Sequence, residues 1–318
     1  MTWAKYQDVW ARGQVVRAGE RESAARYDAI RPYLDRFKRP FTVMDLGACA
    51  GYFCWRIAED YPNAVCVAID GDPVMREAVA LNKNPRVLWL NRFATPRDME
   101  MLSRAAHFDV VLALSVFHRI GKNARESLEM MHATLNQAGM LAFVDLPNEK
   151  ESTPDRLHMS RIAAVRSALG KRMYHPTAVA EIDVLTDRHR AWKRTLYLLE
   201  RQRYEMLGWY TQATTIKVIA TYDRKTCTVH HGKSKQDEVR DWVAGMNLWA
   251  FLVLGGAWPD RETIVRMLEG VELKEDSMAC NLILGDGVTP IDGEGVDFVE
   301  NVRERVTHEI RHTQEIRR

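Results

Sequence analysis

The stretch that decides the fold is VMDLGACAGYFCWRIAED, residues 43–60. An apolar run reaches Asp45, breaks into small residues and then becomes amphipathic with helix-like spacing. Gly47 and Gly51 have no Cβ, so the backbone between them can turn sharply and come close to a ligand. This order predicts a strand that passes into a helix through a ligand-binding turn.

Strand-like and helix-like patterns alternate along the chain from this turn onward. Short apolar runs predict strands at 42–46, 65–69, 87–90, 108–114 and 140–146. Helical patterns fall between them at 53–60, 73–82, 97–105 and 123–136. Two further runs, 181–186 and 194–200, are predicted as additional strands. The alternation predicts an α/β fold, with a mostly parallel sheet and helices on both faces.

An acidic residue stands at the end of the second predicted strand. Asp70 follows Gly51 by 19 residues, where a carboxylate can accept hydrogen bonds from both ribose hydroxyls. Together with the glycine turn, this acid indicates a nucleoside-type ligand. The alternative is that Gly47 is an ordinary turn residue and Asp70 a helix cap. A dinucleotide needs the spacing G-x-G-x-x-G, whereas this turn reads G-A-C-A-G.

The order D-x-G-x-x-x-G resembles motif one of the class I S-adenosylmethionine-dependent methyltransferases. Residues 108–120, FDVVLALSVFHRI, resemble the family's fourth motif, and the whole resemblance covers about residues 35–205. It implies a Rossmann-like, seven-stranded sheet and S-adenosylmethionine as the cofactor. One departure is Cys49, which stands where the family has its middle glycine and which narrows or reshapes the turn.

The resemblance also implies which residues contact the cofactor. The turn residues Gly47, Ala48, Cys49 and Gly51 would lie under the methionine part, with Asp45 near its amino group. Asp70 would bind the ribose. Arg92 and Phe93 would lie beside the adenine, and Leu114 and Ser115 beside the cofactor.

His118 is the candidate catalytic base, because a neutral imidazole can accept a proton near pH 7. The alternative is that it packs or caps the following loop. The segment LSVFHRI also resembles the methyltransferase half of bifunctional kinase-methyltransferases that terminate O-antigen polysaccharides, which implies a glycan or phosphorylated glycan end as acceptor. An anionic phosphate needs positioning cations more than a base. Candidate cations are Arg119, Lys122, Arg188, Arg190, Lys193 and Arg194.

Two domains are expected. Residues 1–205 would form the methyltransferase domain, with N-terminal helices in 1–38, and residues 206–318 a smaller α+β domain. The latter is predicted to contain a hairpin, long helical stretches and a C-terminal helix from about residue 296. It also resembles a shrunken, inactive kinase, whose weak metal-site candidates are Asp276, Asn281 and Asp292, with Lys217 as the nucleotide lysine and Glu238 as its helix partner. The alternative is a small helical domain whose acids are turn residues.

Composition narrows the function less than the motifs do. Lys and Arg number 45 against 43 Asp and Glu, so the formal charge of +2 neither indicates nor excludes nucleic acid. Five cysteines without a C-x-x-C pair fit a reduced, cytoplasmic protein, and no apolar run is long enough for a membrane span. We therefore expect no metal, a glycan, phosphoglycan or small-molecule acceptor, and a homo-oligomer as one option. The alternatives are a methyltransferase acting on RNA or a metabolite, and a non-catalytic cofactor-binding regulator.

Overall fold

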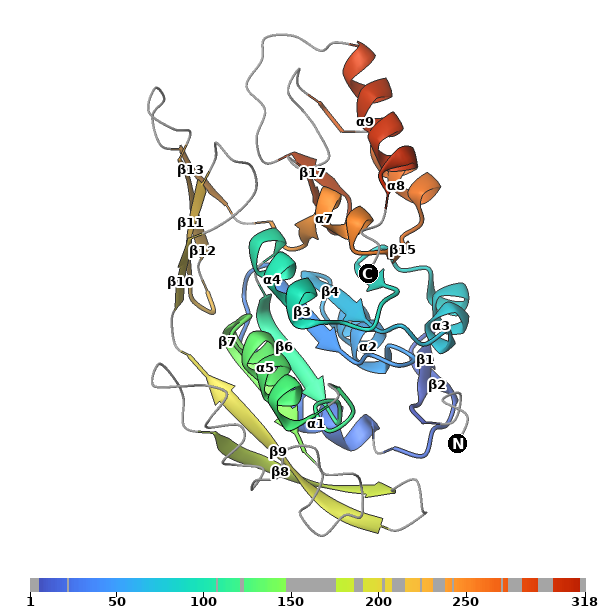
Figure 1. The fold of residues 1–318 in the computed structure, drawn as a ribbon, viewed down its shortest axis with the longest axis vertical. Helices are drawn as coiled ribbons and strands as arrows, with labels where there is room; N and C mark the ends of the chain where they lie inside the picture. Colours follow the sequence, from blue (N-terminus) through green and yellow to red (C-terminus); the bar gives the residue numbers. More distant parts are fainter. Residues whose placement is uncertain are drawn as a thin grey trace.

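The computed structural model describes residues 6–21, 23–106, 108–120, 123–146, 176–185, 191–201, 204–207, 215–223, 225–230, 238–241, 243–269, 271–273, 282–290 and 300–314. Its centre is a large sheet of the strands β3 (Phe41–Leu46), β4 (Ala64–Ile69), β5 (Val87–Leu90), β6 (Phe108–Leu114), β7 (Ala138–Asp145), β8 (Thr177–Leu185), β9 (Ala191–Glu200) and β15 (Gly256–Trp258). The strand order is β15-β5-β4-β3-β6-β7-β9-β8 (Figure 1).

The pairing confirms the predicted α/β fold with a mostly parallel sheet. Strands β5, β4, β3, β6 and β7 are parallel neighbours, whereas β9 is antiparallel to β7 and to β8. All seven predicted strands are present. The count of seven needs one correction, because β15 adds an eighth strand antiparallel to β5. Three residues are too few to show a periodic pattern, and their pairing partner lies far away in the sequence.

Helices cover both faces of this sheet, as predicted (Figure 1). On one face, α1 (Ser23–Leu34), α2 (Tyr52–Asp60) and α3 (Val74–Asn82) bury apolar side chains against alternate residues of the strands. On the other, α4 (Pro96–Ala105) and α5 (Ala124–Leu135) do the same against the intervening residues. Since successive strand residues point to opposite faces, nearly continuous apolar runs are needed to fill both layers.

The N-terminal segment corrects the expectation of helices throughout residues 1–38. Strands β1 (Val9–Ala11) and β2 (Gln14–Arg17) form an antiparallel hairpin before α1 begins. Arg12 and Gly13, with φ of 54° and 75°, form its two-residue turn. Left-handed residues at both turn positions match the twist of the strands, so this turn overrides the helix-like spacing of Tyr6 and Trp10.

The C-terminal part contains two small antiparallel sheets. One has the order β10 (Tyr204–Leu207), β11 (Thr215–Ala220), β12 (Lys225–His230) and β13 (Glu238–Asp241); the other has β14 (Met246–Asn247), β16 (Leu282–Leu284) and β17 (Val288–Pro290). The predicted hairpin is confirmed as β11 and β12. The prediction of Glu238 as a helix partner is wrong, because Glu238 begins a strand that pairs with β12.

Three helices are described in the same part of the chain. Short helices α7 (Leu248–Val253) and α8 (Arg261–Met267) replace the long helical stretches expected there, and α9 (Glu300–His312) confirms the predicted C-terminal helix. Helix α7 packs in the same buried apolar cluster as residues of the central strands, and β15 pairs with β5 of the central sheet. The domain boundary at residues 205 and 206 stays a prediction.

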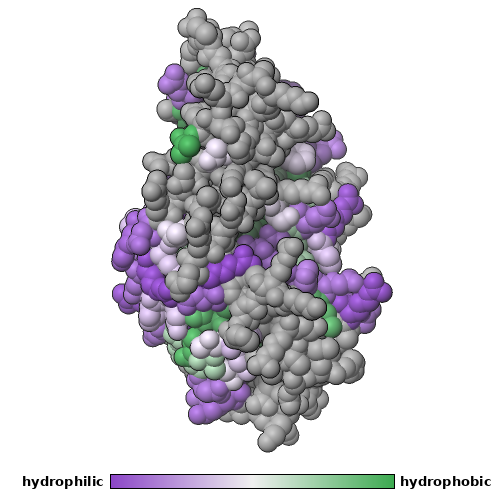
Figure 2. All heavy atoms as spheres, turned by 90° about the vertical axis from the view of Figure 1, so that its left-hand side faces the viewer, coloured by the Kyte–Doolittle hydropathy of each residue, from purple (hydrophilic) through white to green (hydrophobic). Residues whose placement is uncertain are grey.

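On the face shown in Figure 2, the described residues are mostly hydrophilic, and hydrophobic ones form small patches. Among the helices that the structure describes, none combines the length and apolar character needed to cross a bilayer.

Candidate functional site

The site lies at the carboxyl ends of β3, β4 and β6, where the strand order reverses between β3 and β6. In open parallel sheets such a reversal leaves a crevice for ligands. The turn after β3 is built on left-handed residues: Gly47 has φ of 75°, Cys49 of 54° and Gly51 of 72°. A Cβ on Gly47 would lie 2.7 Å from Val116 Cγ2, so the turn has no room for a larger residue there. The sequence prediction of a tight turn is therefore confirmed.

Asp70 follows β4 and faces this turn. Its Oδ2 accepts a hydrogen bond of 2.7 Å from the Cys49 N–H, and its Oδ1 accepts one of 2.8 Å from the Asp72 N–H. Burial raises the pKa of Asp70, while these two backbone donors oppose the rise. Each carboxylate oxygen can accept more than one hydrogen bond, so Asp70 can hold the turn and still bind hydroxyl groups.

Asp45 is the second acid of the turn, and it is buried on β3. Burial, followed by the nearby Asp70, raises the pKa of Asp45 from 3.8 to about 7. The Cys54 thiol lies 3.8 Å from Asp45 Oδ2. Burial, followed by Asp70, also raises the pKa of the Cys49 thiol to about 12, so this thiol stays protonated and unreactive near pH 7.

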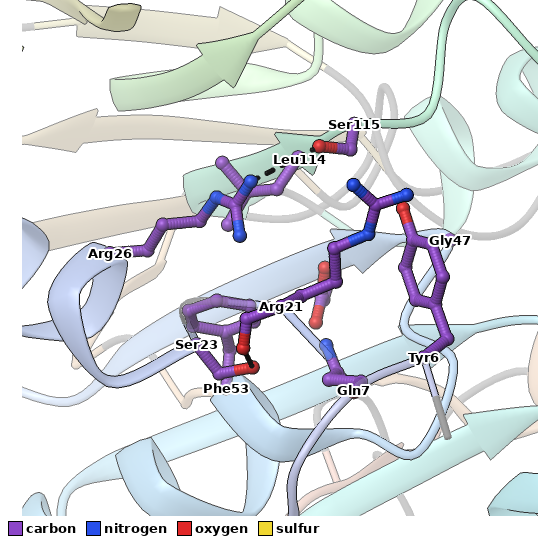
Figure 3. A pocket seen from close by; sticks show the side chains of 10 residues that line it. Tyr6, Gln7, Arg21, Ser23, Arg26, Gly47, Phe53, Leu114 and Ser115 are labelled. Carbon is purple, nitrogen blue, oxygen red and sulfur yellow. Dashed lines mark hydrogen bonds between the residues drawn. The ribbon is translucent and has the colours of Figure 1, made fainter. Parts of the chain in front are cut away.

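A cavity opens beside the turn (Figure 3). It is lined by Tyr6, Gln7, Arg21, Ser23, Arg26, Asp45, Gly47, Phe53, Leu114 and Ser115. The sequence predictions include four of these residues, Asp45, Gly47, Leu114 and Ser115. Ala48 is buried in the turn and does not line this cavity.

The N-terminal segment supplies cavity residues that the sequence analysis missed. The Arg21 guanidinium lies 4.5 Å from the centre of the Tyr6 ring, and the two side chains lie side by side in Figure 3. Gln7 Oε1 accepts hydrogen bonds from the N–H groups of Ala50 and Tyr52, at 3.1 and 3.2 Å. Gln7 thereby caps the start of α2 and ties the N-terminal segment to the glycine turn. No local pattern in the sequence indicates these contacts.

Opposite this segment, a buried network surrounds Ser115 at the end of β6. Ser115, whose φ is 56°, donates its N–H and its hydroxyl to Asp145. Its Oγ accepts hydrogen bonds from Arg194 Nη1 at 2.7 Å and Arg26 Nη2 at 3.3 Å, and Arg26 Nε donates to Asp145 Oδ2 at 2.9 Å. Burial alone would raise the pKa of Asp145, yet both guanidiniums and the Ser115 hydroxyl hold it below its usual value.

His118 is buried just beyond this network. Its Nδ1 has no hydrogen-bond partner among the described residues. Burial first, and then the charges of Arg194 and Arg119, lower the pKa of His118 well below its usual value, while Asp145 opposes them. His118 is therefore neutral at pH 7, and the effects that lower its pKa also make it a weaker proton acceptor than an ordinary histidine.

Arg92 and Phe93, the residues predicted beside the adenine, differ in their exposure. The Arg92 guanidinium forms an ion pair of 3.2 Å with Asp98 of α4, and both side chains are largely buried. Phe93 is 64% exposed, and its ring covers Gly71, next to Asp70. Phe93 is therefore the one of the pair that is open to a ligand.

Several other candidates have no described environment. Lys122, Arg188, Arg190, Asp276, Asn281 and Asp292 lie outside the described residues, and only the backbone of Lys217 is described. The described residues contain no group of three or more His, Cys, Asp or Glu side chains placed to hold a metal ion.

Comparison with known proteins adds a family match. Residues 44–141 match the family described as "Methyltransferase domain". No curated protein matches the chain. Among solved structures, the bifunctional kinase-methyltransferase WbdD aligns at 16% identity and a TM-score of 0.45, over 92% of this chain and 81% of that chain. Magnesium protoporphyrin IX methyltransferase from Synechocystis PCC 6803, solved with bound SAM, aligns at 14% identity and a TM-score of 0.41, over 56% and 78%. An O-methyltransferase family protein from Burkholderia thailandensis aligns at 19% identity and a TM-score of 0.37, over 56% and 57%.

Proposed function

We propose, from the premise that residues 44–141 form a class I S-adenosylmethionine-dependent methyltransferase domain, that this chain methylates an oxygen on a glycan end or a phosphorylated glycan end. The observation that carries the proposal is the acid-and-glycine turn, which brings Asp45 and Gly47 to one cavity, with Asp70 bonded to the turn. A nucleoside with a charged tail fits this combination of groups.

The residues of the cavity fit the amino-acid end of the cofactor. That end carries an ammonium and a carboxylate, so it needs an acid and a cation in one cavity. Asp45 supports binding of the ammonium, and Arg21 and the Gln7 amide support binding of the carboxylate, since all three line the cavity. The cationic ammonium would stabilise Asp45 in its ionised form, against the effect of burial.

At the other end, Asp70 is proposed to bind the two ribose hydroxyls and Phe93 to cover the adenine. Asp70 keeps free acceptor sites after bonding Cys49 and Asp72, and the exposed Phe93 ring lies next to it over Gly71. The cofactor supplies a methyl group bound to a sulfonium. Transfer of that group is a displacement in line with the acceptor oxygen, so the protein contributes chiefly by aligning the two.

The charges near Ser115 support an anionic acceptor. Arg26 and Arg194 are buried around one carboxylate, Asp145, and Arg21 and Arg119 lie close to His118 and Tyr6. Guanidinium groups bind phosphate oxygens strongly, and an anionic oxygen needs no base. A glycan hydroxyl would need one, and the neutral His118 is the proposed base for that acceptor.

A screen of acceptors with radiolabelled S-adenosylmethionine tests the proposal. We expect label to pass to phosphoglycan or glycan fractions, and not to RNA or small-metabolite fractions. The variant His118→Ala separates the two acceptors, because it should abolish methylation of a hydroxyl and largely spare that of a phosphate.

Other outcomes of the screen would support a different function. Label in RNA or metabolites would keep the methyltransferase and refute the acceptor. Cofactor binding without transfer to any fraction would favour a non-catalytic regulator with a pseudokinase-like module. Failure to bind S-adenosylmethionine or S-adenosylhomocysteine in calorimetry would refute the proposed function as a whole.

A further inference from the structure

The eighth strand of the sheet, β15, comes from the C-terminal part and lies beside the strand that leads to the proposed adenine segment. Gly256 pairs with Leu90, and Trp258 pairs with Trp89. Directly after β5, the Asn91 N–H donates a hydrogen bond of 3.0 Å to the Gly255 carbonyl. The first residue of the segment 91–93 is therefore held by the C-terminal part.

The same strand connects to Asp70. The indole N–H of Trp89, which faces Trp258 in the pairing, donates to the Asp70 carbonyl at 3.0 Å. The Asp70 N–H donates in turn to the Leu90 carbonyl at 3.2 Å. A displacement of β5 would thus move both the ribose-binding acid and the start of the adenine segment.

The position of β15 is itself set by close packing. A Cβ on Gly256 would lie 2.2 to 2.5 Å from ring atoms of Phe251, which is fully buried on α7. The Trp258 indole N–H donates to the Asn84 carbonyl at 3.0 Å, which ties the far end of the strand to the loop before β5. Since a packed aromatic ring cannot yield this much space, a small change at Gly256 must shift the strand or the helix.

We propose that β15 is a positioning element for the adenosine half of the cofactor site, so that the C-terminal part sets cofactor affinity although it lines no part of the described cavity. The inference rests on the proposed function. It predicts that the two halves of the cofactor respond to different parts of the chain: the adenosine half to residues 255–258, and the amino-acid half to the N-terminal segment.

Two ligands separate these halves. S-adenosylhomocysteine carries both, whereas 5′-methylthioadenosine lacks the amino and carboxylate groups. We expect Gly256→Ala to weaken the binding of both ligands by a similar factor, about 2- to 30-fold, as is typical for coupling through packed elements. Arg21→Gln should weaken S-adenosylhomocysteine alone. The matched control is Gly287→Ala in the same C-terminal part, where an added Cβ meets nothing within 4 Å and binding should not change.

A second variant covers the case that Gly256→Ala does not fold. Trp258→Phe keeps an aromatic ring and removes the hydrogen bond to Asn84, and it should cause a smaller loss in the same direction for both ligands. Circular dichroism in the aromatic region establishes that each variant is folded, and calorimetry gives the affinities.

The inference is overturned if folded Gly256→Ala or Trp258→Phe binds both ligands as the unaltered protein does. It is also overturned if these variants weaken S-adenosylhomocysteine and leave 5′-methylthioadenosine unchanged. If the unaltered protein binds neither ligand, the proposed function fails and this inference fails with it.

Discussion

Asp45→Asn should make the protein more stable near neutral and alkaline pH, at a cost in cofactor binding. Asp45 is buried on β3 just before the glycine turn, and burial is the largest cause of its raised pKa of about 7. A folded-state pKa above the unfolded value of 3.8 means that Asp45 binds its proton more tightly in the folded state than in the unfolded state. The stabilisation is complete below about pH 3.8 and is lost as pH rises through about 7.

The magnitude follows from the two pKa values. Between them the folded state holds about one more proton than the unfolded state, so the unfolding free energy falls by about 1.4 kcal/mol per pH unit. From pH 5 to pH 7 this amounts to a loss of about 2 kcal/mol. An asparagine side chain at this position would have nearly the same shape and no charge, so the loss should be missing from the Asp45→Asn variant.

Denaturant unfolding at pH 5, 6, 7 and 8 measures this effect. The difference in unfolding free energy between Asp45→Asn and the unaltered protein should grow by about 2 kcal/mol from pH 5 to pH 7, in favour of the variant. Asp223→Asn is the control, since Asp223 is exposed in the turn between β11 and β12 and should give a constant difference. If the unfolding free energies of Asp45→Asn and the unaltered protein differ by the same amount at every pH, the reasoning is refuted, because Asp45 would then ionise alike in the folded and unfolded states.

Two further substitutions test the site. Asp70→Ala should lower the affinity for S-adenosylhomocysteine in calorimetry at least 100-fold, since two charge-assisted hydrogen bonds to the ribose contribute about 1.5–3 kcal/mol each; unchanged affinity would show the ribose assignment to be mistaken. Asp145→Ala should reduce the free energy of unfolding by about 3–5 kcal/mol, because it removes the carboxylate that pairs with the buried Arg26 guanidinium. A denaturation midpoint like that of the unaltered protein would contradict this role.

Local patterns were enough to predict most of the central sheet and its helices. The runs at 87–90 and 108–114 coincide with β5 and β6. The helix predicted at 53–60 differs from α2 by one residue at its start, and the helix predicted at 123–136 differs from α5 by one residue at each end. These elements are long or strongly apolar, so their periodicity reflects the faces that they bury. The glycine turn was also predictable from the sequence, because left-handed backbone conformations favour glycine and two of its left-handed residues are Gly47 and Gly51.

The errors arose where a short or distant interaction overrides the local pattern. The turn at Arg12 and Gly13 makes a hairpin from residues with helix-like spacing. An interaction was also missed at Arg92, whose place beside the adenine stays a prediction: its guanidinium pairs with Asp98 of α4, whose side chain also caps that helix at Thr95. A residue's type and position indicated a charge near the cofactor, but the partner of that charge depends on how α4 packs.

The sequence by itself determined the alternating α/β architecture, the acid-and-glycine turn and the position of Asp70 after the second central strand. Only the tertiary structure decided which distant residues join them: Arg21 and Gln7 at the cavity, Arg26 and Arg194 around Asp145, and β15 beside β5. The physical reason is that strands and turns follow from contacts between near neighbours, whereas a cavity and a buried charge network join side chains that are distant in the sequence, such as Arg26 and Asp145, which are 119 residues apart. Their partners are chosen by packing, burial and charge pairing, which periodicity does not encode.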